Sequence, residues 1–141
     1  MNALIGVLKV GAMKTLIIIA AILIAFPVHA FDKWTLQDTV LELTWATLHV
    51  IDWGQTLEIA DKSHKYHEHN PILGRHPSKG EVHAYMALGL LVHPIITHTL
   101  PREVVLGDYR IPVRTIWQSV SIVVTGGCVI NNLSIGLNVA F

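Results

Sequence analysis

The sequence predicts an all-α protein, a polytopic membrane helical bundle with three mature transmembrane helices. Of its 141 residues, 52% are hydrophobic and only 14% are charged, which is too apolar a balance for an ordinary soluble domain. Three long, mainly apolar stretches, at about 36–60, 82–100 and 115–137, are separated by polar segments that contain proline. We therefore expect one membrane helical domain, residues 31–141, after a targeting segment.

The charge balance and the cysteine content narrow the classes of function. The 10 lysine and arginine residues equal the 10 aspartate and glutamate residues, so the chain has no net positive field to attract nucleic acid, and no nucleic-acid partner is expected. Cys128 is the single cysteine, which excludes an internal disulfide and a zinc cage built from cysteines. Nine histidines remain as the main candidates for metal binding or proton transfer.

Residues 1–30 have the features of a secretory signal. Lys14 precedes an apolar run from Leu16 to Phe26, and the segment ends in small residues up to Ala30, the expected cleavage point. The residues before Met13 are also apolar, so a retained signal anchor, which would make a fourth membrane helix, is the alternative. Either interpretation places the protein in the bacterial inner (cytoplasmic) membrane.

The first mature helix, 36–60, has a polar stripe along one face. Polar residues interrupt its apolar sequence at spacings of three, four and seven: Asp38, Glu42, His49, Asp52 and Thr56. A carboxylate at the centre of a bilayer costs about 2.5 to 3.5 kcal/mol, so Asp52 is expected to face protein. The alternative is an amphipathic helix that lies on the membrane surface with Trp45 and Trp53 at the interface.

The next segment, 61–81, is predicted to be a histidine-rich loop because it contains four proline and glycine residues. One interpretation is a site for a divalent metal such as zinc, with candidate ligands His64, His67, Glu68 and His69. The other is a structural turn formed by Glu68, Asn70, Pro71 and Gly74, since proline requires an extended residue before it. Neighbouring lysines would oppose a cation.

The helices at 82–100 and 115–137 also carry polar residues on one side, and a short polar loop after Pro101 joins them. Together with the first helix they predict an intramembrane polar core of His49, Asp52, Gln55, Thr56, His93 and Asn132. Asp52 is expected near His93 or Asn132. Such a set can hold a metal, act as an acid and base pair, relay protons, or only form hydrogen bonds between helices. The sequence context shows no activated nucleophile.

Two motifs carry a resemblance to a known family. The run Asp52-Trp53-Gly54-Gln55-Thr56, followed by Glu68-x-Asn70-Pro71-Ile72-Leu73-Gly74-x-His76-Pro77-Ser78, resembles a family of uncharacterised small membrane proteins found in proteobacteria and their phages. The Asp-x-x-x-Thr and Glu-x-Asn-Pro pattern is more loosely similar to a broader group of domains of unknown function, in which the Asp-bearing segment is a membrane helix. The resemblance implies a membrane protein and brings no established activity or site residue.

The sequence therefore favours a small integral membrane protein that is a non-catalytic component or accessory subunit of a membrane complex. Its expected partners are the lipid bilayer, other membrane protein subunits or a second copy of itself. The alternative is a metal-dependent or proton-handling membrane enzyme or transporter that uses the histidines, Asp52 and Glu68. The small size and the short loops favour the first.

Overall fold

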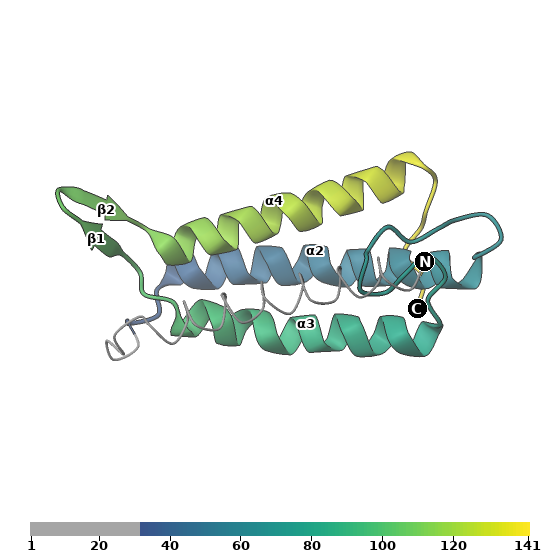
Figure 1. The fold of residues 1–141 in the computed structure, drawn as a ribbon, viewed down its shortest axis with the longest axis horizontal. Coiled ribbons are helices and arrows are strands. Elements are labelled where there is room, and N and C mark those ends of the chain that lie inside the picture. The colour runs from purple at the N-terminus through teal and green to yellow at the C-terminus, as the bar shows by residue number, and fades with distance from the viewer. Residues whose placement is uncertain (1–31) are drawn as a thin grey trace, which may run out of the picture. The chain divides into compact units, whose positions relative to one another are not determined.

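The computed structural model describes residues 32–141, which form three long helices and a two-stranded hairpin (Figure 1). The elements in chain order are α2 (Leu36–Asp61), α3 (Lys79–Thr99), β1 (Val104–Leu106), β2 (Tyr109–Ile111) and α4 (Val113–Ser134). Helix α2 lies between α3 and α4 and packs against both (Figure 1). The predicted all-α class is confirmed. The predicted signal segment lies outside the described residues.

Capping boxes fix where α2 and α3 begin. The hydroxyl of Thr35 accepts a hydrogen bond from the backbone N–H of Asp38, whose carboxylate accepts one from the backbone N–H of Thr35 in return. Ser78 and Glu81 form the same arrangement. Each box satisfies two backbone donors that a helix start otherwise leaves without partners. Helix α3 therefore begins at Lys79, before the residue 82 expected from the apolar pattern.

The loop after Pro101 differs from its prediction, because it contains the hairpin of β1 and β2. The two strands are antiparallel, with Val104 opposite Ile111, and Gly107 has a φ of 61°, which only glycine adopts readily. Strands of three residues are too short to show an alternating pattern. The prediction of a plain polar loop was wrong for this reason.

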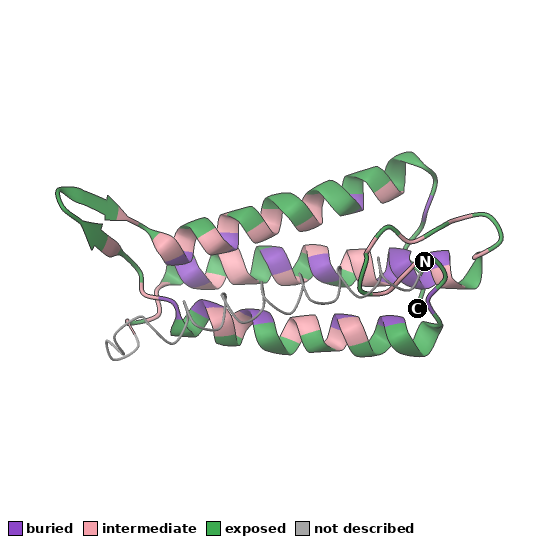
Figure 2. Cartoon of the chain, in the orientation of Figure 1, coloured by how far each residue is buried: buried purple, intermediate pink, exposed green. Residues whose placement is uncertain are grey.

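Within residues 32–141, whose burial Figure 2 shows, many polar side chains are buried beside apolar ones, and many large apolar side chains are exposed. Apolar side chains along all three helices are exposed, among them Leu43 (63%), Leu91 (65%) and Val123 (72%). The buried polar side chains run along the facing sides of the helices: Asp38, His49, Gln55, Thr56, Glu58, His93, Thr97, Arg114 and Gln118. So many buried polar groups, together with so many exposed large apolar side chains, are unusual in a protein surrounded by water.

Length and composition alone identify one helix in residues 32–141 that is suited to crossing a membrane, which is α4.

A small apolar cluster of Leu57, Val82 and Met86 packs where α2 and α3 face each other. Trp45, considered for a membrane interface, is instead buried, with 5% of its surface exposed. The burial of Trp45 places that face of α2 against protein.

Candidate functional site

The centre of the bundle holds a polar contact that joins all three helices. Nδ1 of His93 on α3 donates a hydrogen bond of 2.7 Å to Oε1 of Glu42 on α2. The other carboxylate oxygen of Glu42 accepts one of 3.1 Å from Nε2 of Gln118 on α4. Because one carboxylate receives donors from two helices, this contact fixes the positions of α3 and α4 along α2.

Two tryptophans enclose the imidazole of His93. Its ring is stacked on Trp45 at a centroid distance of 3.6 Å and on Trp117 at 5.1 Å. Nε1 of Trp117 donates to the hydroxyl of Thr97 at 3.1 Å. Nε2 of His93 is buried and has no hydrogen-bond partner within residues 32–141. The imidazole is thus held in one orientation by aromatic packing on both faces and by Glu42.

His49 belongs to the same aromatic group and also depends on a glycine. Its ring stacks on Trp45 at 4.8 Å, and its Nε2 donates to the backbone carbonyl of Met86 at 3.0 Å. A Cβ atom at Gly89 would lie 2.9 Å from the His49 ring. Only glycine at position 89 therefore allows α3 to approach this closely without displacing the ring.

Arg114, expected in the loop before the last helix, lies in the first turn of α4 with 1% of its surface exposed. Its guanidinium donates twice to the carbonyl oxygen of Leu100, at 3.0 and 2.7 Å, and contacts Oδ2 of Asp38 at 3.4 Å. Arg114 therefore satisfies a carbonyl at the end of α3 and neutralises a buried carboxylate of α2.

The predicted polar core is divided between two places. His49 and His93 lie in the aromatic group, whereas Asp52 lies toward the other end, where its Oδ1 accepts a hydrogen bond of 3.1 Å from Nδ2 of Asn132. Of the two partners considered for Asp52, the structure thus brings Asn132 to it. Gln55 is fully buried and donates to the backbone carbonyl of Val129 at 3.4 Å.

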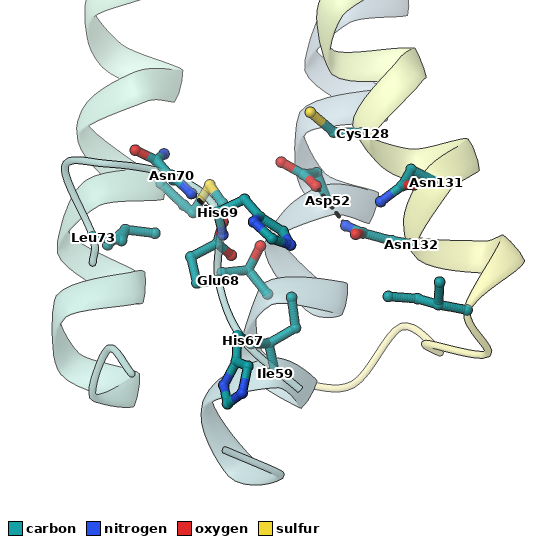
Figure 3. A pocket seen from close by; sticks show the side chains of 13 residues that line it. Asp52, Ile59, His67, Glu68, His69, Asn70, Leu73, Cys128, Asn131 and Asn132 are labelled. Carbon is teal, nitrogen blue, oxygen red and sulfur yellow. Dashed lines mark hydrogen bonds between the residues drawn. The ribbon is translucent and has the colours of Figure 1, made fainter. Parts of the chain in front are cut away.

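A pocket of about 310 Å³ opens beside Asp52 and Asn132 (Figure 3). Side chains from α2 and α4 form two sides of it, and the histidine-rich loop reaches in with Glu68 and His69. The residues that line it are Asp52, Thr56, Ile59, His67, Glu68, His69, Asn70, Leu73, Met86, Cys128, Asn131, Asn132 and Ile135. The pocket therefore combines carboxylates, amides and apolar side chains.

The Glu68-x-Asn70-Pro71 segment forms a turn whose side chains bond to its own backbone. Oε1 of Glu68 accepts hydrogen bonds from the N–H groups of His69 (2.8 Å) and Asn70 (2.7 Å). The side-chain oxygen of Asn70 accepts a hydrogen bond from the N–H of Ile72. The backbone carbonyl of Asn70 accepts one from the N–H of Gly74, whose φ is 76°. These contacts are those of an Asx turn closed by a glycine.

Three of the candidate metal ligands, His67, Glu68 and His69, line the pocket, but they do not form a set that could hold a metal ion. In the part of the chain that the structure describes, no three histidine, cysteine or acidic side chains converge closely enough to hold a metal ion. His64, His67 and His69 are exposed, and the ring of His67 packs edge-on against His76 at 4.8 Å.

Sequence reasoning did not assign Glu42, Trp45, Arg114, Trp117 or Gln118 to a site. Glu42 and Gln118 were placed on polar faces, but nothing in one sequence indicates that they bond to each other.

Comparison of the chain with known protein families, with curated proteins and with solved structures finds no match. The resemblance to a family of small membrane proteins therefore stays a prediction.

Proposed function

We propose that residues 32–141 form a membrane-embedded bundle of three helices that acts as a non-catalytic component of the bacterial inner membrane. The observation that supports this proposal is the distribution of side chains, because many polar side chains are buried between the helices and many large apolar ones are exposed. Lipid offers no hydrogen bonds, so polar groups in a membrane bundle face one another, and the outer surface can be apolar without cost.

Length and composition do not identify α2 and α3 as membrane spans, but such a test does not consider which side of a helix is buried. The buried side of each helix carries polar residues, with Asp38 and His49 on α2 and His93 and Thr97 on α3. A mean hydropathy calculated from composition counts these residues as if they faced lipid. The surfaces that α2 and α3 expose are apolar at Leu43 and Leu91.

A structural role is proposed because the central polar groups hold the helices together. Glu42, His93, Gln118 and Arg114 each contact another helix or its end. Neither Glu42 nor His93 lines the pocket beside Asp52. Polar contacts between helices in small membrane bundles fix their register, and the outer apolar surfaces remain available to lipid or to other subunits.

Spin labels at single cysteines test the membrane environment. In a Cys128→Ser background reconstituted in lipid vesicles, labels at Leu91→Cys and Val123→Cys should collide with dissolved oxygen and be shielded from a water-soluble nickel chelate. A label at Asp108→Cys, in the exposed hairpin turn, is the control and should be reached by the chelate. Equal access of the chelate to all three labels would overturn the proposal.

A further inference from the structure

We propose that the pocket lined by Asp52, Glu68 and Asn132 binds a primary ammonium group, supplied by the head group of an ethanolamine lipid or by a free small amine. The lipid source rests on the proposed membrane function, but the ammonium chemistry does not. Figure 3 shows the pocket. Asp52 of α2 and Asn132 of α4 point toward each other in its wall, and Glu68 enters from the histidine-rich loop.

The pocket has room for a ligand group. Its volume of about 310 Å³ lies at the lower end of the range for small-molecule sites, roughly 300 to 1,000 Å³. Its walls come from α2, α3, α4 and the loop, so side chains surround a bound group from several directions. Ethanolamine, or the end of a lipid head group, is small enough for this space.

Two carboxylates in the pocket each have an oxygen available for a ligand. Asn132 bonds to Oδ1 of Asp52, and the backbone donors bond to Oε1 of Glu68. Within residues 32–141, no hydrogen bond reaches Oδ2 of Asp52 or Oε2 of Glu68. The two negative charges also act on each other across the pocket. A bound ammonium would relieve this repulsion and donate hydrogen bonds to both free oxygens.

The lining distinguishes an ammonium from other ligands. No lysine or arginine of residues 32–141 lines the pocket, so an anion would meet the like charges of Asp52 and Glu68. A divalent metal needs several ligands in close contact, and the described residues form no such group. An ammonium carries three N–H donors and needs only acceptors at ordinary hydrogen-bond distance. The apolar side chains of Ile59, Leu73 and Met86 can pack against the attached carbons.

The pocket lies where a lipid head group would reach it. Asn132 is near the end of α4 at Ser134, and the loop that supplies Glu68 follows the end of α2 at Asp61. In a bundle that spans the bilayer, these helix ends lie at the depth of the head groups. An ethanolamine head group could thus enter from the membrane, and a free amine from water.

Calorimetric titration of the full-length protein in detergent with ethanolamine tests the chemistry. At pH 8, where an imidazole in water is neutral, we expect saturable binding that ethylene glycol does not reproduce. Asp52→Asn, which removes the charge and keeps the shape, should weaken binding at least tenfold. Asp61→Asn is the matched control, because Asp61 is exposed, pairs with Lys79 and lies outside this pocket.

No binding of ethanolamine to the wild type, or equal binding by Asp52→Asn, would overturn the proposal. Glu68→Gln is the second charge variant, and circular dichroism of both variants shows whether they fold. Native mass spectrometry from nanodiscs identifies the source: retention of phosphatidylethanolamine over phosphatidylglycerol supports the lipid, and binding of free ethanolamine alone supports a soluble amine. If spin labels showed that the helices do not face lipid, the titration would still decide the ammonium proposal.

Discussion

The carboxylate of Glu42 lies 2.7 Å from Nδ1 of His93 and joins α2 to α3 in the middle of the bundle. Both side chains are nearly buried, with 13% and 8% of their surfaces exposed. Groups of this polarity are costly to remove from water unless each finds a partner. The contact satisfies Nδ1 of His93 and Oε1 of Glu42, while Gln118 donates to the other oxygen of Glu42. Removal of Glu42 therefore takes the acceptor away from donors on two helices.

Glu42→Ala should lower the free energy of unfolding by about 2 to 6 kcal/mol, because Nδ1 of His93 and Nε2 of Gln118 lose this acceptor, at about 1 to 3 kcal/mol for each buried donor. Denaturation in detergent, followed by circular dichroism, measures this change. Glu42→Gln is the control, because a glutamine can still accept from His93 and should cost less. A loss below about 1 kcal/mol for Glu42→Ala, the size of a surface pair, would show that the contact does not hold the helices together.

Gly89→Ala should destabilise the bundle by about 1 to 3 kcal/mol, because the new Cβ atom would lie 2.9 Å from the His49 ring. Gly127→Ala on α4 is the matched control. It has no neighbour within 4 Å and should be neutral or slightly stabilising, since alanine favours a helix. Thermal unfolding of the two variants compares them directly. Similar behaviour of both would contradict the close approach of α3 to His49.

Asp52→Leu should cost about 1 to 2 kcal/mol, because it leaves the amide of Asn132 without its acceptor, whereas Asp52→Asn should be close to neutral. A double-mutant cycle with Asn132→Leu measures the coupling between the two residues. If Asp52 faced lipid, the leucine variant would instead be more stable than the wild type. Unfolding in detergent therefore distinguishes the two positions.

Gly74→Ala should destabilise the histidine-rich loop by about 1 to 3 kcal/mol, since Gly74 has a φ of 76° and alanine is strained there. The readout is the rate of proteolytic cleavage in the loop, which should rise. Gly80→Ala, in the first turn of α3, has no positive φ and should leave the rate unchanged. An equal rate in Gly74→Ala and the wild type would show that the turn does not require glycine.

The sequence predicted the helices better than it predicted the contacts between them. The apolar runs and polar stripes of 36–60 and 115–137 led to Asp52 and Asn132 as core residues, because a polar group in an apolar helix must face away from lipid. The pairing of Glu42 with His93 was not predicted, because periodicity gives the face of a helix and not its partner. Arg114 was assigned to a loop because a charge is rarely buried, and the acceptors that bury it, Leu100 and Asp38, are distant in sequence.

The contact between Arg114 and Asp38 also has a consequence for biosynthesis, because 76 residues separate the two along the chain. At about 5 to 20 residues per second, a ribosome would add Arg114 about 4 to 15 s after Asp38. During this interval α2 has been made, but the donors from α4 that stabilise Asp38 and Glu42 have not. Until α4 has been synthesised, the side-chain partners available to these carboxylates are Thr35 for Asp38 and His93 for Glu42.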